Sequence, residues 1–135
     1  MYVNDRLIGF DIANLRSGCR VVLARRETRP SADRKFRFSA EGLALGNAAL
    51  GPAATTGADL IIVDEYGPLE LAFQGWRAAT DRLMTSTDAV LLLVVREEWA
   101  DEVQQLYGTV PIRRLVATRT ESTDEVLAVL RNNRS

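Results

Sequence analysis

Two kinds of hydrophobic pattern divide the chain. Near its start, short apolar runs interrupted by polar residues occupy positions 7–12, 21–23 and 36–38. These runs, with a turn at Arg16-Ser17-Gly18 between the first two, predict an antiparallel hairpin followed by one further short strand. From Asp59 onward, aliphatic runs alternate with stretches of helical periodicity. This alternation is typical of parallel strands that are joined by helices and buried on both faces.

The second part of the chain contains three aliphatic runs and three helical stretches. We expect strands at 60–63, 89–95 and 112–118, and helices at 68–83, 97–107 and from 122 onward. The last helix begins with a capping box, in which Ser122 and Glu125 can satisfy each other's exposed backbone donors. The predicted fold class is therefore α/β, a parallel sheet covered on both faces with an antiparallel hairpin at the N-terminal end.

A further helix is expected between the two parts. Residues 40–49 are rich in Ala and Leu, and Ser39 is placed to cap them. Gly42 and Gly46 lie one turn apart in this stretch, although a glycine costs on the order of 1 kcal/mol against alanine inside a helix. Their spacing indicates a helix face that is pressed closely against the sheet.

Composition limits both the class of protein and its chemistry. The 135 residues are 47% hydrophobic and 26% charged, which is typical of a globular chain and fits a single domain over 1–135. No apolar run approaches the roughly 20 residues that span a bilayer, and no signal-like stretch follows Met1, so we expect a cytoplasmic protein without membrane contact. With no histidine and one cysteine, Cys19, the chain cannot build a Ser-His-Asp centre, an imidazole zinc site or an internal disulfide.

Charge is unevenly distributed along the chain. Residues 1–58 carry nine basic and five acidic side chains, a net +4, whereas residues 59–135 carry eight basic and thirteen acidic ones, a net −5. Six of the basic residues lie between Arg25 and Arg37. Such a cluster most often decorates a solvated loop, while contact with a nucleotide or another anion stays open. Nucleic acid is not the expected partner, because the basic positions are confined to one loop.

The segment with the most chemical content follows the first aliphatic run of the second part. It reads Leu60-Ile61-Ile62-Val63-Asp64-Glu65-Tyr66-Gly67-Pro68-Leu69-Glu70-Leu71. A strand over its first four residues places two carboxylates at the carboxyl end, where open α/β sheets bind ligands. In a phosphate-handling site the first acid holds Mg²⁺ and the second polarises an attacking water. The alternative is a strand that simply ends in solvated acids.

Together, residues 58–71 resemble the Walker B region of a nucleoside-triphosphatase family that includes the human cancer-related nucleoside-triphosphatase and its thermophile relatives. In those proteins the strand ends in Asp-Glu-Ile-Gly-Lys/Pro-Met-Glu-Leu, so that Tyr66 stands here for Ile and Leu69 for Met. Segments at 6–12 and 23–25 are similar to the family's Arg-x-Gly-Phe-Asp and Leu-Ala-Arg segments. The resemblance covers nearly all of the chain and implies a parallel three-layer (α-β-α) sheet of the P-loop NTPase type.

The resemblance also implies a nucleotide site and shows that one of its parts, the phosphate loop, has no counterpart in residues 1–135. It assigns Asp64 to Mg²⁺, Glu65 to catalysis as the general base, and Asp64, Gly67 and Glu70 to nucleotide binding. Family members begin with a strand and a Gly-x-x-Gly-x-Gly-Lys-Thr phosphate loop, but no such run occurs here, where Lys35 is the only lysine. We therefore expect a sheet without the P-loop strand. Because that loop neutralises the phosphates, we expect no appreciable hydrolysis by the chain alone.

Two functions follow as hypotheses. The chain is a nucleoside-triphosphatase that converts NTP to NDP and phosphate with Mg²⁺ once a phosphate loop is supplied, or a non-catalytic α/β module that binds a protein or, weakly, a nucleotide. Loss of an internal strand leaves strand edges unpaired. The expected partner is therefore a second copy or a chain carrying the loop, unless the sheet closes across the gap. Trp76 and Trp99 are expected in the core, and Arg96 is either a surface residue or a phosphate contact.

Overall fold

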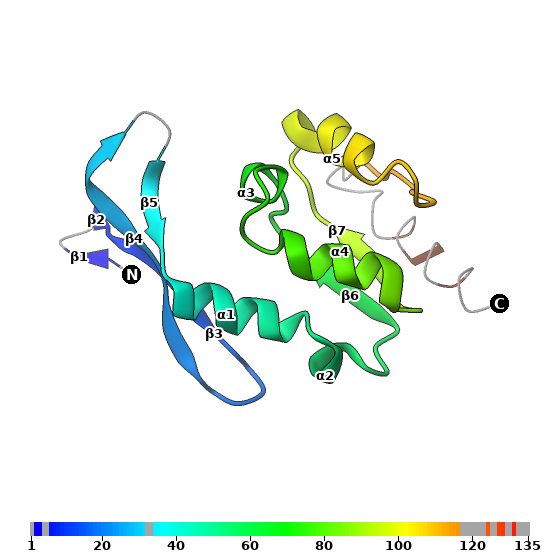
Figure 1. Cartoon of the computed structure of the whole chain (residues 1–135), viewed down its shortest axis with the longest axis horizontal. Coiled ribbons are helices and arrows are strands. Elements are labelled where there is room, and N and C mark those ends of the chain that lie inside the picture. Colours follow the sequence, from blue (N-terminus) through cyan, green and yellow to red (C-terminus); the bar gives the residue numbers. More distant parts are fainter. Residues whose placement is uncertain are drawn as a thin grey trace.

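The protein combines an antiparallel N-terminal part with a part built on parallel strands (Figure 1). The computed structural model describes residues 2–3, 6–31 and 34–116, together with residues 124, 127, 128 and 131. The expected α/β class is confirmed. The capping box expected at Ser122 and Glu125 lies outside the described residues.

The N-terminal part is a three-stranded antiparallel sheet. It consists of β3 (Gly9–Ala13), β4 (Arg20–Ser31) and β5 (Arg34–Phe38), with β4 in the centre. A short antiparallel pair, β1 (Tyr2–Val3) and β2 (Arg6–Leu7), precedes it. The hairpin and the additional strand expected from the apolar runs are confirmed.

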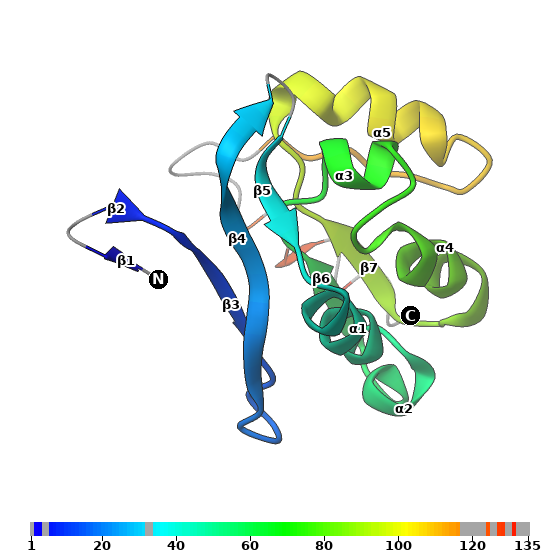
Figure 2. The ribbon, with the colours of Figure 1, turned by 60° about the vertical axis from the view of Figure 1, so that its left-hand side comes forward.

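Helix α1 (Ala40–Ala49) lies between this sheet and the parallel strands (Figure 2). Its cap is the expected one, since the Ser39 hydroxyl accepts a hydrogen bond from the N–H of Gly42 at 2.9 Å. A Cβ atom on Gly42 would lie 2.7 Å from the Cα of Leu23 in β4, and one on Gly46 would collide with the ring of Trp76. The two glycines therefore let α1 pack closely against β4 at Gly42 and against Trp76 at Gly46. A short helix, α2 (Pro52–Thr55), follows.

The second part is built on two parallel strands, β6 (Leu60–Val63) and β7 (Val90–Leu93), which pair residue for residue. Helices α3 (Pro68–Leu71) and α4 (Arg77–Ser86) connect the two strands. A 3₁₀ turn at Glu97–Trp99 and helix α5 (Ala100–Leu106) follow β7. The buried cluster at the centre of this part consists of Val63, Tyr66, Val103 and Tyr107. Leu91, Leu93, Val95, Trp76 and Met84 pack against it. The expected packing of Trp76 against the core is confirmed, with the side chain only partly buried.

The opposite face of the parallel pair is much less covered. Side chains alternate between the two faces of a strand, and Ile62 is 55% exposed while its neighbours Ile61 and Val63 are 7% and 4% exposed. Val94, directly after β7, is 44% exposed. In the part of the chain that the structure describes, no third strand extends the parallel pair. No helix among the described residues is long and apolar enough to cross a membrane.

The single helix expected at 68–83 is wrong in its length. The chain forms two helices there, because α3 ends at Leu71 and α4 begins at Arg77. Phe73 and Gly75 between them adopt left-handed φ values of 58°, which no α-helix continues. The apolar spacing of the segment therefore reflects two short helices that contribute to one core.

The strand expected at 112–118 is not formed over residues 112–116, and residues 117 and 118 lie outside the described part. Residues 112–114 are exposed, although a parallel strand inside a sheet is normally buried. Arg114 donates a hydrogen bond of 2.6 Å to Asp101 in α5. This contact ties the segment to the helix instead of to a strand edge.

Candidate functional site

Two acidic residues follow β6 at its carboxyl end. Asp64 and Glu65 are both exposed, and the Asp64 carboxylate accepts a hydrogen bond of 3.0 Å from the backbone N–H of Glu65. Glu65 has a left-handed φ of 59°, a conformation that costs a residue other than glycine roughly 1 kcal/mol or more. Tyr66 then returns to the sheet, since its N–H donates to the carbonyl of Val94. The two acids therefore lie on a turn between the end of β6 and Tyr66, which is hydrogen-bonded to the residue after β7.

Arg96 is the positive charge beside these acids. Its guanidinium donates to the Glu65 carboxylate at 3.0 Å and 3.2 Å, and about two thirds of each side chain is exposed. Because Arg96 follows β7, the two neighbouring parallel strands deliver opposite charges to the same edge of the sheet. The ion pair is open to water and to exchange with a ligand.

Glu70 has a different environment from the other two acids. It is 3% exposed, and its two carboxylate oxygens accept hydrogen bonds from the N–H groups of Gly67 at 3.0 Å and Trp76 at 3.1 Å. One side chain thus ties the turn after β6 to the start of α4. Gly75 is required here, because a Cβ at its left-handed φ would collide with this carboxylate. The contacts of Glu70 are those of a residue that positions the segment, and its role toward nucleotide stays a prediction.

Gly67 is buried beside the second tryptophan of the chain. A Cβ on Gly67 would lie 3.8 Å from the ring of Trp99, which is half-buried. Gly67 donates a hydrogen bond from its N–H to Glu70, and its carbonyl accepts one from the N–H of Leu71. Its predicted role in nucleotide binding is therefore tied to the position of Glu70.

A chain of polar side chains, buried except at Asp81, contacts the segment that follows β6. The Tyr66 hydroxyl bonds that of Tyr107, which donates to the Asp81 carboxylate at 2.9 Å. Arg77 donates to the same carboxylate at 2.8 Å and to the carbonyl of Glu70 at 3.3 Å. Burial raises the pKa of Tyr66, and burial together with the bond to Tyr66 raises the pKa of Tyr107 above its ordinary value. Both hydroxyls therefore keep their protons at neutral pH.

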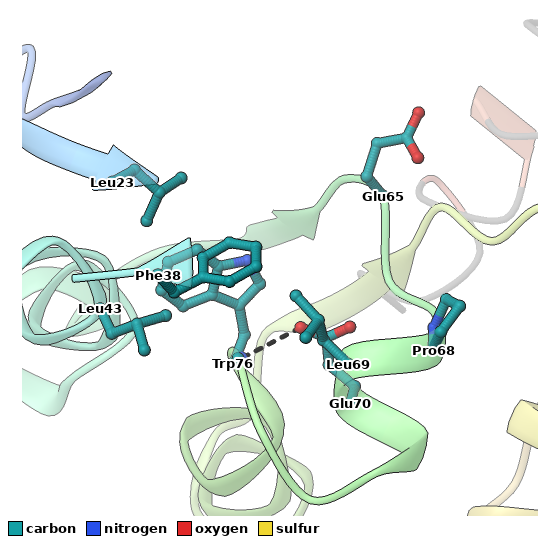
Figure 3. A pocket seen from close by; sticks show the side chains of 9 residues that line it. Leu23, Phe38, Leu43, Glu65, Pro68, Leu69, Glu70 and Trp76 are labelled. Carbon is teal, nitrogen blue, oxygen red and sulfur yellow. Dashed lines mark hydrogen bonds between the residues drawn. The ribbon is translucent and has the colours of Figure 1, made fainter. Parts of the chain in front are cut away.

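A small pocket of about 240 Å³ opens next to the acids (Figure 3). The apolar residues that line it come from both parts of the molecule and are Leu23, Phe38, Leu43, Pro68, Leu69 and Trp76. Glu65 and Glu70 also line it, but the Glu70 carboxylate is already bound to the backbone. In Figure 3 the Glu65 side chain points away from the aromatic rings.

The sequence predicts the position of the acids, but neither the chain of polar side chains nor the pocket. Arg77 and Asp81 carry a local signal, since oppositely charged residues four apart pair on one helix face. The hydrogen bond between Tyr66 and Tyr107 joins residues 41 positions apart, so no local sequence pattern predicts it. The sequence predicts Phe38 only as a strand residue, because most residues that line the pocket with it are distant in sequence.

The donor set can be compared with the needs of Mg²⁺. No group of three or more acidic, histidine or cysteine side chains that could hold a metal ion occurs among the described residues. A dedicated protein cage for Mg²⁺ is therefore not built in this part of the chain. Exposed carboxylates of the kind that Asp64 supplies do fit Mg²⁺ that is shared with substrate phosphates, which needs one or two protein carboxylates.

Fold and site together define an α/β protein with two acids and an arginine at the carboxyl edge of a parallel strand pair. A family model described as NTPase matches residues 1–134, so the chain belongs to this NTPase family. The NTPase relationship expected from residues 58–71 is thereby confirmed. No curated protein and no solved structure matches the chain.

Proposed function

We propose that this protein is the Walker B-bearing part of a nucleoside-triphosphatase that converts NTP to NDP and phosphate when a phosphate loop is supplied. The observation that carries the proposal is the exposed pair Asp64 and Glu65 at the carboxyl end of a parallel strand, in a chain of the NTPase family. Asp64 would bind Mg²⁺, which supplies positive charge beside the phosphates. Glu65 would accept the proton of the attacking water at its carboxylate.

The backbone at Glu65 supports this role. Its left-handed φ of 59° is tolerated most easily by glycine, yet the position carries a carboxylate. Strained residues of this kind cluster at functional sites, where the surrounding structure holds them. Here the hydrogen bond from the N–H of Glu65 to Asp64 and the return of Tyr66 to the sheet hold the turn.

The phosphate loop must come from elsewhere than residues 1–135, since their sequence contains no glycine-rich run followed by Lys-Ser or Lys-Thr. The less covered face of β6 and β7, with Ile62 and Val94, offers a place for such a segment, because parallel strands are normally covered on both faces. With that segment in place the sheet would take the three-layer form of P-loop NTPases. We propose a loop-bearing chain as the partner, with a second copy of this protein as the alternative.

The competing function is a non-catalytic binding module. The contact between Glu65 and Arg96 favours it, because the carboxylate proposed to contact the attacking water contacts a guanidinium instead. On this hypothesis Asp64 and Glu65 are surface acids and nucleotide binds weakly or not at all. Substitution of either acid would then leave every measured property unchanged.

The test compares the chain alone with the chain fused to a family phosphate-loop segment. Calorimetry with ATP or GTP and Mg²⁺ measures binding, and phosphate release measures turnover. We expect hydrolysis only in the fusion. There, Glu65→Gln should lower kcat by about 10²-fold or more and leave nucleotide binding intact, whereas Asp64→Asn should weaken the Mg²⁺-dependent part of binding.

A matched control is Asp88→Asn, which changes an exposed acid just before β7, at the opposite edge of the sheet. It should alter neither binding nor turnover. A fusion that binds and hydrolyses nucleotide equally well with Glu65→Gln would rule out the assigned general base. Failure of both acid variants to change anything in an active fusion would favour the non-catalytic role of these positions.

A further inference from the structure

The pocket beside Glu65 has features that the proposed phosphate chemistry does not use. Its walls are apolar and include two aromatic side chains, Phe38 from the end of β5 and Trp76 from the start of α4. Phe38 is 37% exposed although it is a large apolar ring. Phe38 and Trp76 make no ring-to-ring contact in the described part of the chain. Trp76 packs against the core and against α1 and is only partly buried, so both rings contribute part of their surface to the pocket.

The size and charge of the pocket restrict what it can take. A volume of about 240 Å³ is below the range of pockets that enclose a whole drug-sized ligand. An anionic group is disfavoured inside, because Glu65 and Glu70 are the charged residues of its lining. A neutral, flat ring system satisfies both conditions.

The pocket lies next to the acids that follow β6, so a ring bound in the pocket would be close to them. Glu65 lines the pocket and also stands at the carboxyl end of β6. A nucleotide joins a neutral flat base to an anionic phosphate chain through ribose, so one molecule can place its base in the pocket and its phosphates outside it. Base stacking on aromatic side chains is tolerant of base identity, since every base has a π-face.

We propose that the pocket between Phe38, Leu69 and Trp76 is the binding site for the nucleobase of the nucleotide. This inference rests on the proposed function for the identity of the ligand. It assigns the base to residues of both parts of the molecule, so that the antiparallel sheet contributes Phe38 to a site whose acids belong to the parallel strands. The base site is independent of any phosphate loop.

The test uses nucleosides, which lack phosphate, on the full chain. Trp99→Phe leaves Trp76 as the only tryptophan, because the sequence contains two. Its fluorescence is excited at the long-wavelength edge of the band, where nucleosides do not absorb, during titration with adenosine and with guanosine. We expect saturable quenching with either nucleoside, weakened about tenfold or more by Phe38→Ala.

The matched control is Phe73→Ala, which removes the same ring from a residue that is 76% exposed and does not line the pocket. It should leave the quenching unchanged. Circular dichroism reports whether Phe38→Ala is folded, and Phe38→Leu, which keeps apolar contact but removes the ring, replaces it if it is not. Absence of saturable quenching, or equal weakening by the two phenylalanine variants, would overturn the base site.

A parallel titration with tripolyphosphate and Mg²⁺ separates this inference from the proposed function. Nucleoside binding lost with Phe38→Ala supports the base site whether or not tripolyphosphate binds. Nucleotide hydrolysis by the loop fusion without any nucleoside binding would leave the NTPase function in place and remove the base site.

Discussion

The two faces of the parallel strand pair differ in exposure, although both carry aliphatic side chains. On the covered side, Ile61 and Val63 are buried, and hydrogen bonds join Tyr66 to Tyr107 at the end of α5 and Tyr107 to Asp81 in α4. On the other side and at the carboxyl edge, Ile62 is 55% exposed and Glu65 is paired only with an exposed arginine. The first side is a completed core. The second has the composition of a core and the exposure of a surface, which is typical of a place where another layer binds.

Substitutions of the two adjacent isoleucines should give the largest difference in the free energy of unfolding. Ile61→Ala should lower the free energy of unfolding by about 3 kcal/mol, because it removes buried methyl groups and leaves a cavity. Ile62→Ala should lower it by less than about 1 kcal/mol in the chain alone, since that side chain is largely exposed. Urea unfolding monitored by circular dichroism measures both. Equal losses would show that the second face is covered in solution.

The glutamates make a second matched pair. Glu70→Gln should cost about 2 kcal/mol, because a buried carboxylate that accepts two backbone hydrogen bonds is replaced by a neutral amide with one acceptor. Glu65→Gln should change stability by no more than about 0.5 kcal/mol, as that side chain is exposed. Thermal and urea unfolding test the difference. A Glu70→Gln protein as stable as the parent would remove the positioning role of this carboxylate.

The buried tyrosines predict a loss of stability at high pH. The folded state raises the pKa of both Tyr66 and Tyr107, so above about pH 10 the unfolded chain loses tyrosine protons that the folded protein keeps. Stability is then constant up to about pH 10 and falls as pH rises further. Urea unfolding at several alkaline pH values measures this slope. Tyr107→Phe should make it shallower, and an unchanged slope would contradict the assignment.

The smallest effect is expected for the ion pair at the edge. A double-mutant cycle with Glu65→Ala and Arg96→Ala should give a coupling energy below about 1 kcal/mol, because both side chains are about two thirds exposed and water screens their attraction. Added salt should reduce it further. A coupling well above this value would show that the edge is less open to solvent than its exposure indicates.

Much of the site's location was predictable because its signals are local. The run Leu60-Ile61-Ile62-Val63 followed by Asp64 and Glu65 predicts a strand and its carboxyl end, and the structure places β6 over those four residues. The expected burial on both faces is wrong for the face that carries Ile62, which is 55% exposed. The cap by Ser39 was also predictable, since capping acts within the first helical turn. The spacing of Gly42 and Gly46 indicated a closely packed helix face, but not that Gly42 meets Leu23 of β4. The break between α3 and α4 was not, because Phe73 and Gly75 interrupt the helix without disturbing its apolar spacing.

By itself, the sequence determined the α/β class, the hairpin, the first helix, the acidic turn and the family to which the chain belongs. Only the tertiary structure decided that Glu70 is buried while Glu65 is exposed, and that Phe38 and Trp76 share a pocket. Hydrophobic period and turn chemistry act over a few neighbouring residues, so they can be seen in one sequence. Burial and side-chain pairing depend on which distant segments meet, as the bond between Tyr66 and Tyr107 illustrates.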